Sequence, residues 1–342
     1  MLHLAVDIGW GWTLALKTVL VLAVVPLAAL VLGYTFLLKM MSHMQSRLGP
    51  MDPGGFHGWF QLVGDGIKFL QKEDVMPAEA DRRVFALAPA VVVISTFLIF
   101  VVVPTGPKLV VENLDVGVFY ALAVSSLSVI GVLMAGWASA NKFALLGALR
   151  AAAQLIAYEL PLLLAVVGVV VQAGTMSLQG IVKAQQEGSI FGWSGLGFPF
   201  ILTQVVGFLL FLVASQAELT QTPFDMPVAE SELVAGYMVE YTGFRFLFFF
   251  IGEFGTAFAF AALAATLFLG GWSLPWVHGA GADLLGIPIL FTKLMLVAFL
   301  MFWVRFTYPR LREDQLQSLA WKVLIPIGLL NIIVTGVFKV AF

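Results

Sequence analysis

Cysteine is absent from this chain of 342 residues, and histidine occurs only four times. Without cysteine the chain has no disulfide, no thiolate nucleophile and no cysteine ligand for an iron–sulfur cluster. None of the four histidines lies inside a long apolar run, which excludes a haem held by two histidines between membrane spans. No glycine-rich nucleotide fingerprint follows a strand pattern either. We therefore predict that the chain itself binds no metal and no redox cofactor.

Charged residues are also scarce, at 11% of the chain, against about 25% in a typical soluble domain. The 18 Lys and Arg and the 20 Asp and Glu leave a net charge of −2, so the chain has no basic surface for nucleic acid. Hydrophobic residues make up 61% of the sequence, and the mean hydropathy is +0.99. This composition excludes a soluble enzyme, a disordered chain and a nucleic-acid binder.

Apolar runs of about 20 residues recur along the whole sequence, and each is long enough to cross a hydrocarbon core of about 30 Å as a helix. We predict an all-α, polytopic membrane protein in the lipid bilayer, with residues 1–342 forming a single membrane domain. About eight transmembrane helices are expected, at residues 15–38, 84–104, 116–138, 151–173, 198–217, 246–270, 287–305 and 322–341.

The Lys and Arg residues are distributed unevenly between the loops that join these spans. Thirteen lie in or beside the odd-numbered loops, whereas the even-numbered loops hold only Lys108 and Lys183. Because cytoplasmic loops carry the excess of positive residues, we predict that the odd-numbered loops are cytoplasmic. Both termini are then expected on the outer side of the membrane.

The long first loop contains a segment with helical amphipathic spacing. Trp59, Phe60, Val63 and Ile67 share one face, and polar residues fill the opposite face. We predict an amphipathic helix over residues 56–72 on the inner membrane surface. Its glycines weaken it as an isolated helix, so we expect it to pack against protein as well as lipid. It serves either as a surface anchor or as the wall of an opening to the lipid.

Among the ionisable side chains in or beside predicted spans, four are of particular interest: Glu159, Glu218, Glu253 and Lys293. A charge at mid-membrane costs about 2.5–3.5 kcal/mol, so such residues usually face a bundle interior or a wet cavity. The three carboxylates fall in the inner half of the predicted membrane, and Lys293 falls in the outer half. We interpret the carboxylates as an inward-facing half-channel for protons. The alternative is that each acid is neutral and hydrogen-bonded to a neighbouring helix.

A polar stripe leads to the first of these acids. Arg150, Gln154 and Tyr158 repeat every four residues on one face of the fourth span, and Glu159 follows directly. Such a stripe is typical either of a relay or of hydrogen bonding between helices.

The predicted fifth loop, residues 218–245, mixes acids with apolar residues. It carries five Asp and Glu residues against one Arg, together with Pro223, Phe224 and Met226. A solvated loop would not contain so many apolar side chains, so we predict a folded acidic loop that lines a cavity or docks a partner. Residues 229–241 are compatible with a helix, with Glu230 or Glu232 stabilising its N-terminus.

Four stretches of the chain closely resemble the H-subunit family of NADH:quinone oxidoreductase, the respiratory complex I. They are MQSRLGP at 44–50, DGIKFLQKED at 65–74, NKFALLGALRAAAQLIAYELP at 141–161 and PFDMPVAESELVAGYMVEYTGFRF at 223–246. The last two are long and unusual, and the resemblance covers nearly the whole chain. It implies a multi-pass subunit in the cell membrane of a bacterium, with no turnover when isolated.

The resemblance also implies roles for individual residues. The first span, the amphipathic helix and the sixth span help to form a tunnel for the quinone tail, while the quinone head reacts in a neighbouring peripheral subunit. The implied quinone-cavity residues are Arg47, Trp59, Phe224, Asp225, Glu230 and Glu232. The implied relay residues are Glu159, Glu218, Glu253, Tyr158, Arg150 and Lys293.

The same resemblance implies partners and cofactors outside this chain. Iron–sulfur clusters and FMN are expected in partner subunits, with quinone as the substrate. The expected partners are the peripheral quinone-site subunits, the iron–sulfur subunit, and the small and antiporter-like membrane subunits.

The sequence departs from the family's pattern in four places. Leu37 and Leu38 replace the usual acid and arginine at the end of the first span, and residues 51–55 differ from the usual Asn-Arg-Val-Gly-Pro. Gln221 stands where arginine is usual, and Val228 stands where an acid is common. These positions lie near the expected quinone entrance, so the quinone type and the electron donor stay open.

Three alternatives remain from the sequence alone. A homologous subunit of a ferredoxin- or hydrogenase-linked complex would differ only in its neighbours. A stand-alone secondary transporter commonly shows repeated halves, and this sequence has no convincing internal repeat. A purely structural anchor would hold inert buried acids.

Overall fold

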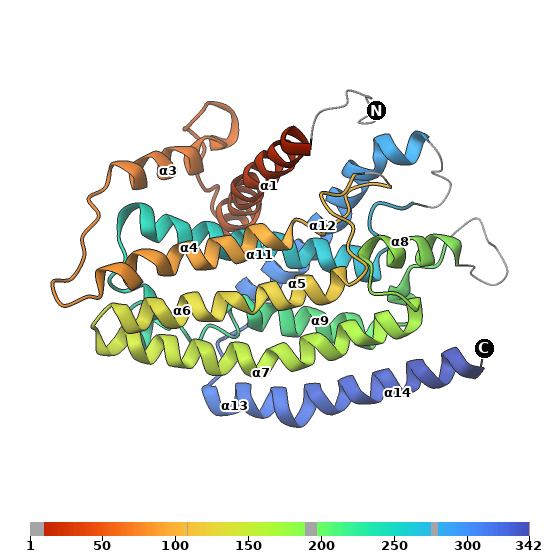
Figure 1. Ribbon diagram of the computed structural model, residues 1–342. Helices are drawn as coiled ribbons and strands as arrows, with labels where there is room; N and C mark the ends of the chain where they lie inside the picture. The colour runs from red at the N-terminus through yellow and green to blue at the C-terminus, as the bar shows by residue number, and fades with distance from the viewer. Residues whose placement is uncertain (1–9, 108, 189–196, 275–279, 342) are drawn as a thin grey trace.

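The computed structural model describes residues 10–107, 109–188, 197–274 and 280–341 (Figure 1). Within these ranges the regular structure is entirely helical. Seven helical stretches of the described residues, three of them made of consecutive helices, are long and apolar enough to cross a membrane. The predicted class, an all-α polytopic membrane protein, is therefore confirmed.

The helices follow the apolar runs but differ from the predicted ranges. They are α1 (Trp10–Leu32), which continues through a π-helical segment (Gly33–Met40) into α2 (Met41–Met44), α3 (Gln61–Gln71), α4 (Arg82–Ile99), α5 (Gly117–Ser125), α6 (Leu127–Ala138), α7 (Lys142–Ala173), α8 (Leu178–Glu187), α9 (Val205–Glu218), α10 (Glu230–Leu233), α11 (Gly243–Phe268), α12 (Ala280–Thr307), α13 (Glu313–Leu319) and α14 (Ile325–Ala341).

The predicted count of eight spans is not confirmed, because α9 has only 14 residues. At 1.5 Å per residue such a helix covers about 21 Å, which is short of a hydrocarbon core of about 30 Å.

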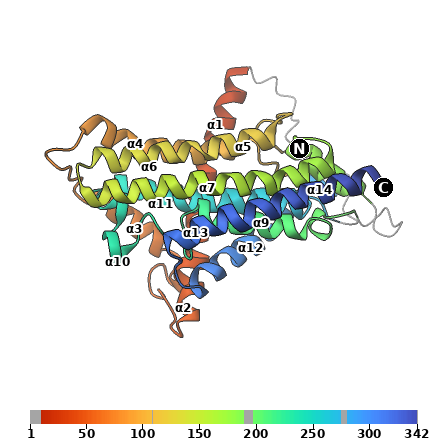
Figure 2. The ribbon, with the colours of Figure 1, turned by 90° about the horizontal axis from the view of Figure 1, so that it is seen from below.

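Most of the long helices run alongside one another, and α1 crosses them at a steep angle (Figures 1 and 2). Helix α14 lies along α7 at one edge of the bundle. Small residues allow the helices inside the bundle to pack closely against one another. A Cβ added at Gly136 of α6 would lie only 2.2 Å from the Cβ of Ala148 on α7. Alanines also dominate the buried second half of α11.

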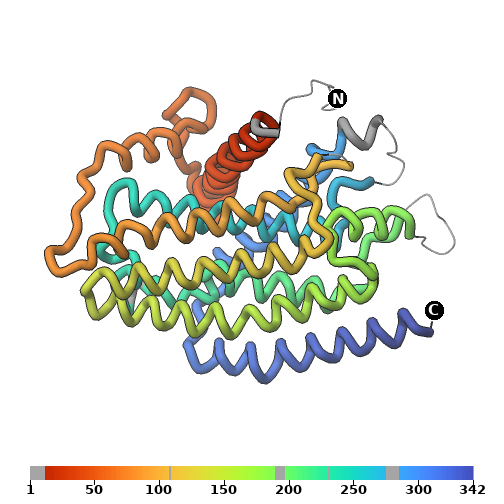
Figure 3. The backbone as a smooth tube through the Cα atoms, viewed as in Figure 1, coloured from red at the N-terminus to blue at the C-terminus, as the bar shows by residue number. Residues whose placement is uncertain are grey.

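The connecting segments gather at two opposite ends of the bundle (Figure 3). At one end, the Asn141 amide donates to Glu240 at 2.6 Å, and the Leu311 backbone N–H donates to the Pro223 carbonyl at 2.9 Å. These contacts join the third, fifth and seventh connections, and we call this the odd-loop end. At the other, the even-loop end, the Ser177 hydroxyl lies 3.0 Å from the Asn113 amide oxygen.

Helix α3 is the amphipathic helix of the first connection, and none of its residues is fully buried. It packs on protein along one side, where the Phe69 and Phe246 rings are 5.6 Å apart. One continuous helix over 56–72 does not form, because His57 adopts a φ of 59° in a separate 3-10 turn at Phe56–Gly58.

Residues 229–241 do not form the continuous helix with which their sequence is compatible. The segment forms only the four-residue α10 and a 3-10 turn at Gly236–Met238. Val234 lies between them at φ 67° and ψ −64°, outside the helical region. Gly236 has φ 55°, and a Cβ there would lie 1.6 Å from the Pro227 carbonyl oxygen. The close approach of the Pro227 backbone therefore excludes a regular helix through this point.

Candidate functional site

Glu253, on α11, is the centre of a polar cluster near the odd-loop end. Its Oε1 accepts from Arg305 Nη1 of α12 at 2.9 Å and from Gln221 Nε2 at 3.2 Å. The Arg305 guanidinium also lies 5.7 Å from the ring centres of Phe254 and Phe302. A carboxylate held by a guanidinium between aromatic rings is a strong, well-oriented ion pair. Glu253 is therefore an ion-paired acid in this fold.

Asp225 belongs to the same cluster, on the link between α9 and α10. Burial raises the pKa of the Asp225 carboxyl, and Glu253 adds to the rise. The backbone N–H of Ala229 and the guanidiniums of Arg310 and Arg305 act in the opposite direction on this pKa. Its Oδ1 is buried without a hydrogen-bond partner in the described part of the chain. A half-buried, incompletely satisfied carboxyl with a raised pKa is a candidate for proton exchange.

Tyr237, in the 3-10 turn, is the third member of this cluster. Burial raises the pKa of its hydroxyl, with further contributions from Glu253 and Asp225. Its ring packs edge-on against Phe249 of α11 at 5.4 Å. This tyrosine is thus a neutral neighbour of both acids at physiological pH.

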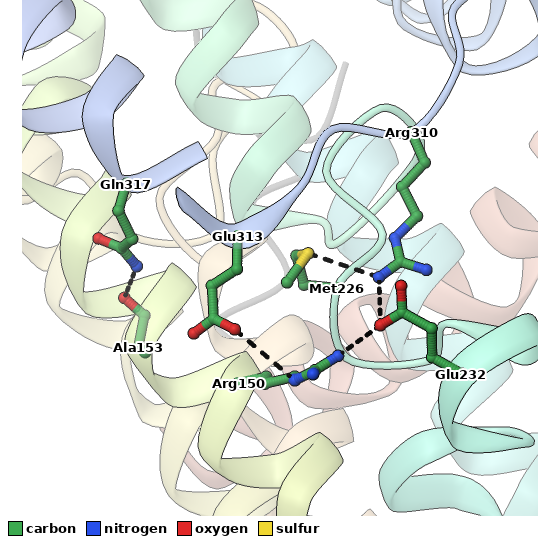
Figure 4. A network of polar contacts seen from close by, with 7 residues as sticks. All are labelled: Arg150, Ala153, Met226, Glu232, Arg310, Glu313 and Gln317. Atoms are coloured by element: carbon green, nitrogen blue, oxygen red, sulfur yellow. Dashed lines mark hydrogen bonds and ion pairs between the residues drawn. The ribbon is translucent and has the colours of Figure 1, made fainter. Parts of the chain in front are cut away.

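Glu232 forms a second ion-pair group, which Figure 4 shows. Its Oε2 accepts from Arg150 Nη1 of α7 at 2.8 Å and lies 3.1 Å from Arg310 Nη2. The hydrogen bonds from Arg150 and Arg310 hold the pKa of Glu232 below its usual range. Arg150 Nε also lies 3.7 Å from Glu313 of α13. One carboxylate therefore ties α10 to α7 and to the segment before α13.

Gln154 fastens the end of α9 to α7. Its Nε2 donates to the carbonyl oxygens of Ala217 and Phe224, both at 2.7 Å. Glu218, the last residue of α9, is buried beside this anchor, and its Oε2 has no hydrogen-bond partner among the described residues. Glu159 of α7 acts on it electrostatically. The two acids from predicted spans four and five thus belong to one neighbourhood.

Tyr158 and Phe224 are packing residues of this region. The Tyr158 hydroxyl donates to the Leu316 carbonyl at 2.9 Å, and its ring meets Phe224 at 5.3 Å. Both side chains are buried, with exposed fractions of 0% and 4%. Phe224 therefore supports the acidic loop from inside.

Several predicted site residues lie away from these clusters. Arg47 and Trp59 are exposed on the first connection, where they contact Gln45 and Gly54 respectively. Lys293 lies at the even-loop end, where its Nζ donates to the carbonyls of Leu269 and Ser273 at 2.6 Å. The side chain of Glu230 is outside the described part of the chain.

Sequence reasoning missed the partners of the acids. Arg305 and Arg310 entered it only as positive charges near an odd-numbered loop, and Gln221 only as a departure from the family pattern. An arginine just inside a span end was the available signal, because such a charge needs a partner. Across the described residues, no group of three or more His, Cys, Asp and Glu side chains is suited to hold a metal ion.

Comparisons with known proteins identify the family of the chain. The sequence model of the NADH dehydrogenase family matches residues 16–336. The H subunit of the NADH-quinone oxidoreductase of Geobacillus kaustophilus is 46% identical over 94% of this chain and 93% of its own length. The H subunits from Anoxybacillus flavithermus and Brevibacillus brevis are 47% and 44% identical, over 89% and 96% of this chain and over 87% and 94% of their own lengths. The resemblance read from the sequence is confirmed: the chain belongs to the NADH dehydrogenase family, among the H subunits of NADH-quinone oxidoreductase.

Proposed function

We propose that this chain is the H subunit of a proton-pumping NADH:quinone oxidoreductase in a bacterial cell membrane. The observation that carries the proposal is its identity of 44–47% with relatives of that name over about nine-tenths of the chain. The chain spans the membrane with its odd-loop end in the cytoplasm and both termini outside. It has no turnover alone, since FMN and the iron–sulfur clusters belong to partner subunits.

The acids and arginines of the odd-loop end couple quinone chemistry to proton movement. Reduction of quinone in a peripheral partner changes the charge near the acidic loop and thereby the proton affinity of Asp225. Asp225 and Glu253 both interact with Arg305 and act on each other electrostatically, so a proton gained by one acid changes the electrostatic free energy of the other. Each unit of pKa change corresponds to about 1.4 kcal/mol.

The relay then continues through Gln221, Glu218 and Glu159 toward the antiporter-like subunits. Its support is the placement of Gln221 between the α9 turn and Glu253, and the electrostatic interaction of Glu218 with Glu159. Helix α7 is held beside these residues by the side chains of Arg150, Gln154 and Tyr158. Lys293 is a proposed outer member of the relay, at the far end of the bundle.

Quinone access is proposed beside α1, α3 and α11. Its support is the adjacency of these elements: a Cβ at Gly33 would lie 3.0 Å from the Leu62 side chain of α3, and Phe69 of α3 packs near Phe246 of α11. The Tyr34 hydroxyl donates to the His57 carbonyl at 3.0 Å and joins the segment after α1 to the connection that precedes α3. Arg47 and Trp59 lie along the approach, and Phe224, Asp225, Glu230 and Glu232 belong to its inner end.

A detergent pull-down of the tagged chain from its native membrane tests this function. Co-purification of iron–sulfur and antiporter-like subunits, with NADH-dependent quinone reduction, is the expected result. Recovery of the assembly without NADH activity would assign another electron donor. Recovery of the chain alone, stable and monodisperse, would overturn the subunit role in favour of a transporter.

A further inference from the structure

A cavity of about 360 Å³ lies at the even-loop end, far from the acidic loop. It is lined by four segments: the end of α8, the connection before α9, the turn after α11, and one face of α12. Its walls are mainly apolar and include Phe198, Ile201, Leu274 and Leu296. Polar groups are few, and the charged one is Lys293.

Lys293 enters this cavity without a carboxylate partner. None of the ion pairs in the described part of the chain includes it. Its Nζ donates to the carbonyls of Leu269 and Ser273, which leaves the third N–H of the ammonium available. The end of α11 offers only about half a negative charge in compensation. A half-buried cation in an apolar setting therefore retains attraction for an anion.

The cavity reaches the molecular surface on the α12 side. Leu296 is 57% exposed on its rim, and α12 carries a stripe at helical spacing that continues through Phe299 and Trp303, both exposed. Residues 292, 296, 299 and 303 lie on one helix face because they are three or four apart. This exposed apolar stripe is suited to an acyl chain.

We propose that this cavity binds an anionic phospholipid of the outer leaflet, with the phosphate at Lys293 and an acyl chain along Leu296 and Phe299. Basic pockets between transmembrane helices are suited to lipid phosphates, and a charge-assisted bond from an ammonium to a phosphate is strong in a setting of low dielectric constant. The bound lipid fixes the turn after α11 against α12.

Lys339 provides a matched control. It lies on α14 at the same end of the bundle, and its Nζ donates to the Val171 carbonyl at 2.6 Å near the end of α7. It thus makes the same kind of contact with a helix terminus, but it does not line the cavity. If replacement of Lys293 acted only through the loss of a contact with a helix terminus, replacement of Lys339 should have the same effect.

The test uses the assembly purified from native membranes and diazirine-labelled phosphatidylglycerol, with labelled phosphatidylcholine for comparison. After illumination, the label on the peptide that contains residue 296 is quantified by mass spectrometry. Phosphatidylglycerol is expected to label this peptide about tenfold more than phosphatidylcholine, which corresponds to about 1.4 kcal/mol. Lys293→Gln should remove this preference, while Lys293→Arg and Lys339→Gln should keep it.

Ile201→Trp provides a second variant that fills the cavity and leaves the Lys293 contacts in place, and it should lower the labelling by a similar factor. Equal labelling by the two lipids, or unchanged labelling in both Lys293→Gln and Ile201→Trp, would overturn the proposal. Loss of labelling in the presence of excess inorganic phosphate would also overturn it, because the site would then take a free anion. These readouts do not depend on NADH or quinone turnover.

Discussion

At the scale of single residues, the main finding is that the acid of α11 has a specific partner. The sequence placed Glu253 among acids of the inner half-membrane, and the fold adds Arg305 at 2.9 Å and Gln221 at 3.2 Å. An ion pair of this kind can hold structure, transmit charge or do both. Variants that separate these two roles are therefore the most informative.

Glu253→Gln leaves the Arg305 charge without its partner. Because both side chains are only half-buried, we expect the free energy of unfolding to fall by about 1–2 kcal/mol. Assembly should persist, and NADH-driven proton pumping, measured in vesicles with a pH-sensitive dye, should fall several-fold. The exposed acid Glu79 supplies a control, since Glu79→Gln should behave as wild type.

The double variant Glu253→Gln with Arg305→Gln replaces the ion pair by two neutral amides. It should recover much of the stability but not the pumping, if Glu253 carries charge in the relay. Recovery of both quantities would instead assign Glu253 a structural role.

Asp225 gives a prediction about pH. Because burial raises its pKa in the folded protein, the folded state binds more protons than the unfolded state between pH 3.8, the ordinary value, and the raised pKa. Its contribution to stability is therefore present below the ordinary value and is lost as pH rises through the raised pKa. Asp225→Asn should remove this loss. The thermal unfolding midpoint of the variant, minus that of the wild type, should therefore increase as pH rises from 4 to 7.

Thermal unfolding in detergent across this pH range measures the effect. The exposed Asp115 offers a control, because the curve of Asp115→Asn should run parallel to that of the wild type. A constant difference between Asp225→Asn and wild type at all pH values would contradict the prediction.

At the scale of elements, helix α14 is held to the bundle by a small polar network. Asn331 Nδ2 donates to Gln204 Oε1 at 2.8 Å, and Gln204 Nε2 donates to the Thr335 hydroxyl at 2.7 Å. Gly168 of α7 lies against the same amides, where a Cβ would be 2.9 Å from Asn331 Nδ2. Such hydrogen bonds matter for α14, because most of its surface faces away from the bundle.

Asn331→Leu removes the donor and leaves the Gln204 oxygen unpaired. We expect a loss of about 0.6–1.7 kcal/mol, the range measured for hydrogen bonds between membrane helices. Unfolding in mixed detergent with increasing dodecyl sulfate measures the change. The exposed Ile333 gives the matched control, and equal stabilities of Asn331→Leu and Ile333→Leu would show that the network contributes nothing.

The acidic loop shows why element boundaries were harder to predict than spans. Its composition suggested a helix over 229–241, but the chain returns past Pro227 so closely that only a glycine fits at 236. This constraint comes from residues that are nine apart in sequence and in contact in space. Local propensity has no information about such an approach.

At the scale of the whole molecule, the two ends of the bundle differ in chemistry. The odd-loop end holds the ion-pair groups of Glu253 and Glu232 and most of the Lys and Arg residues. The even-loop end holds the cavity beside Lys293. This asymmetry fits a subunit that meets soluble partners on one side only, with the odd-loop end in the cytoplasm.

The absence of cysteine makes this orientation easy to measure. Glu79→Cys at the odd-loop end and Asp115→Cys at the even-loop end each introduce a single exposed thiol. In intact cells, a membrane-impermeant maleimide should label only Asp115→Cys, whereas inverted vesicles should label only Glu79→Cys. The opposite pattern would reverse the proposed orientation.

The class of the protein and its family could both be read from the amino-acid sequence. Hydropathy and long motifs are properties of contiguous residues, so they can be recognised without knowing how helices pack. Glu159 and Glu253 could be singled out for the same reason, since a charge in an apolar run is visible locally, whereas Asp225 was singled out through the resemblance to the family.

Which of these residues meet could be learned only from the folded chain. Glu253 pairs with Arg305 across 52 residues, and Glu232 is shared by Arg150 and Arg310 from opposite sides of the sequence. The fold also separates Lys293 from the acids and puts it beside a cavity of its own. The rotation and depth of each helix depend on its packing against the others, and this packing selects one set of partners from the many that the sequence allows.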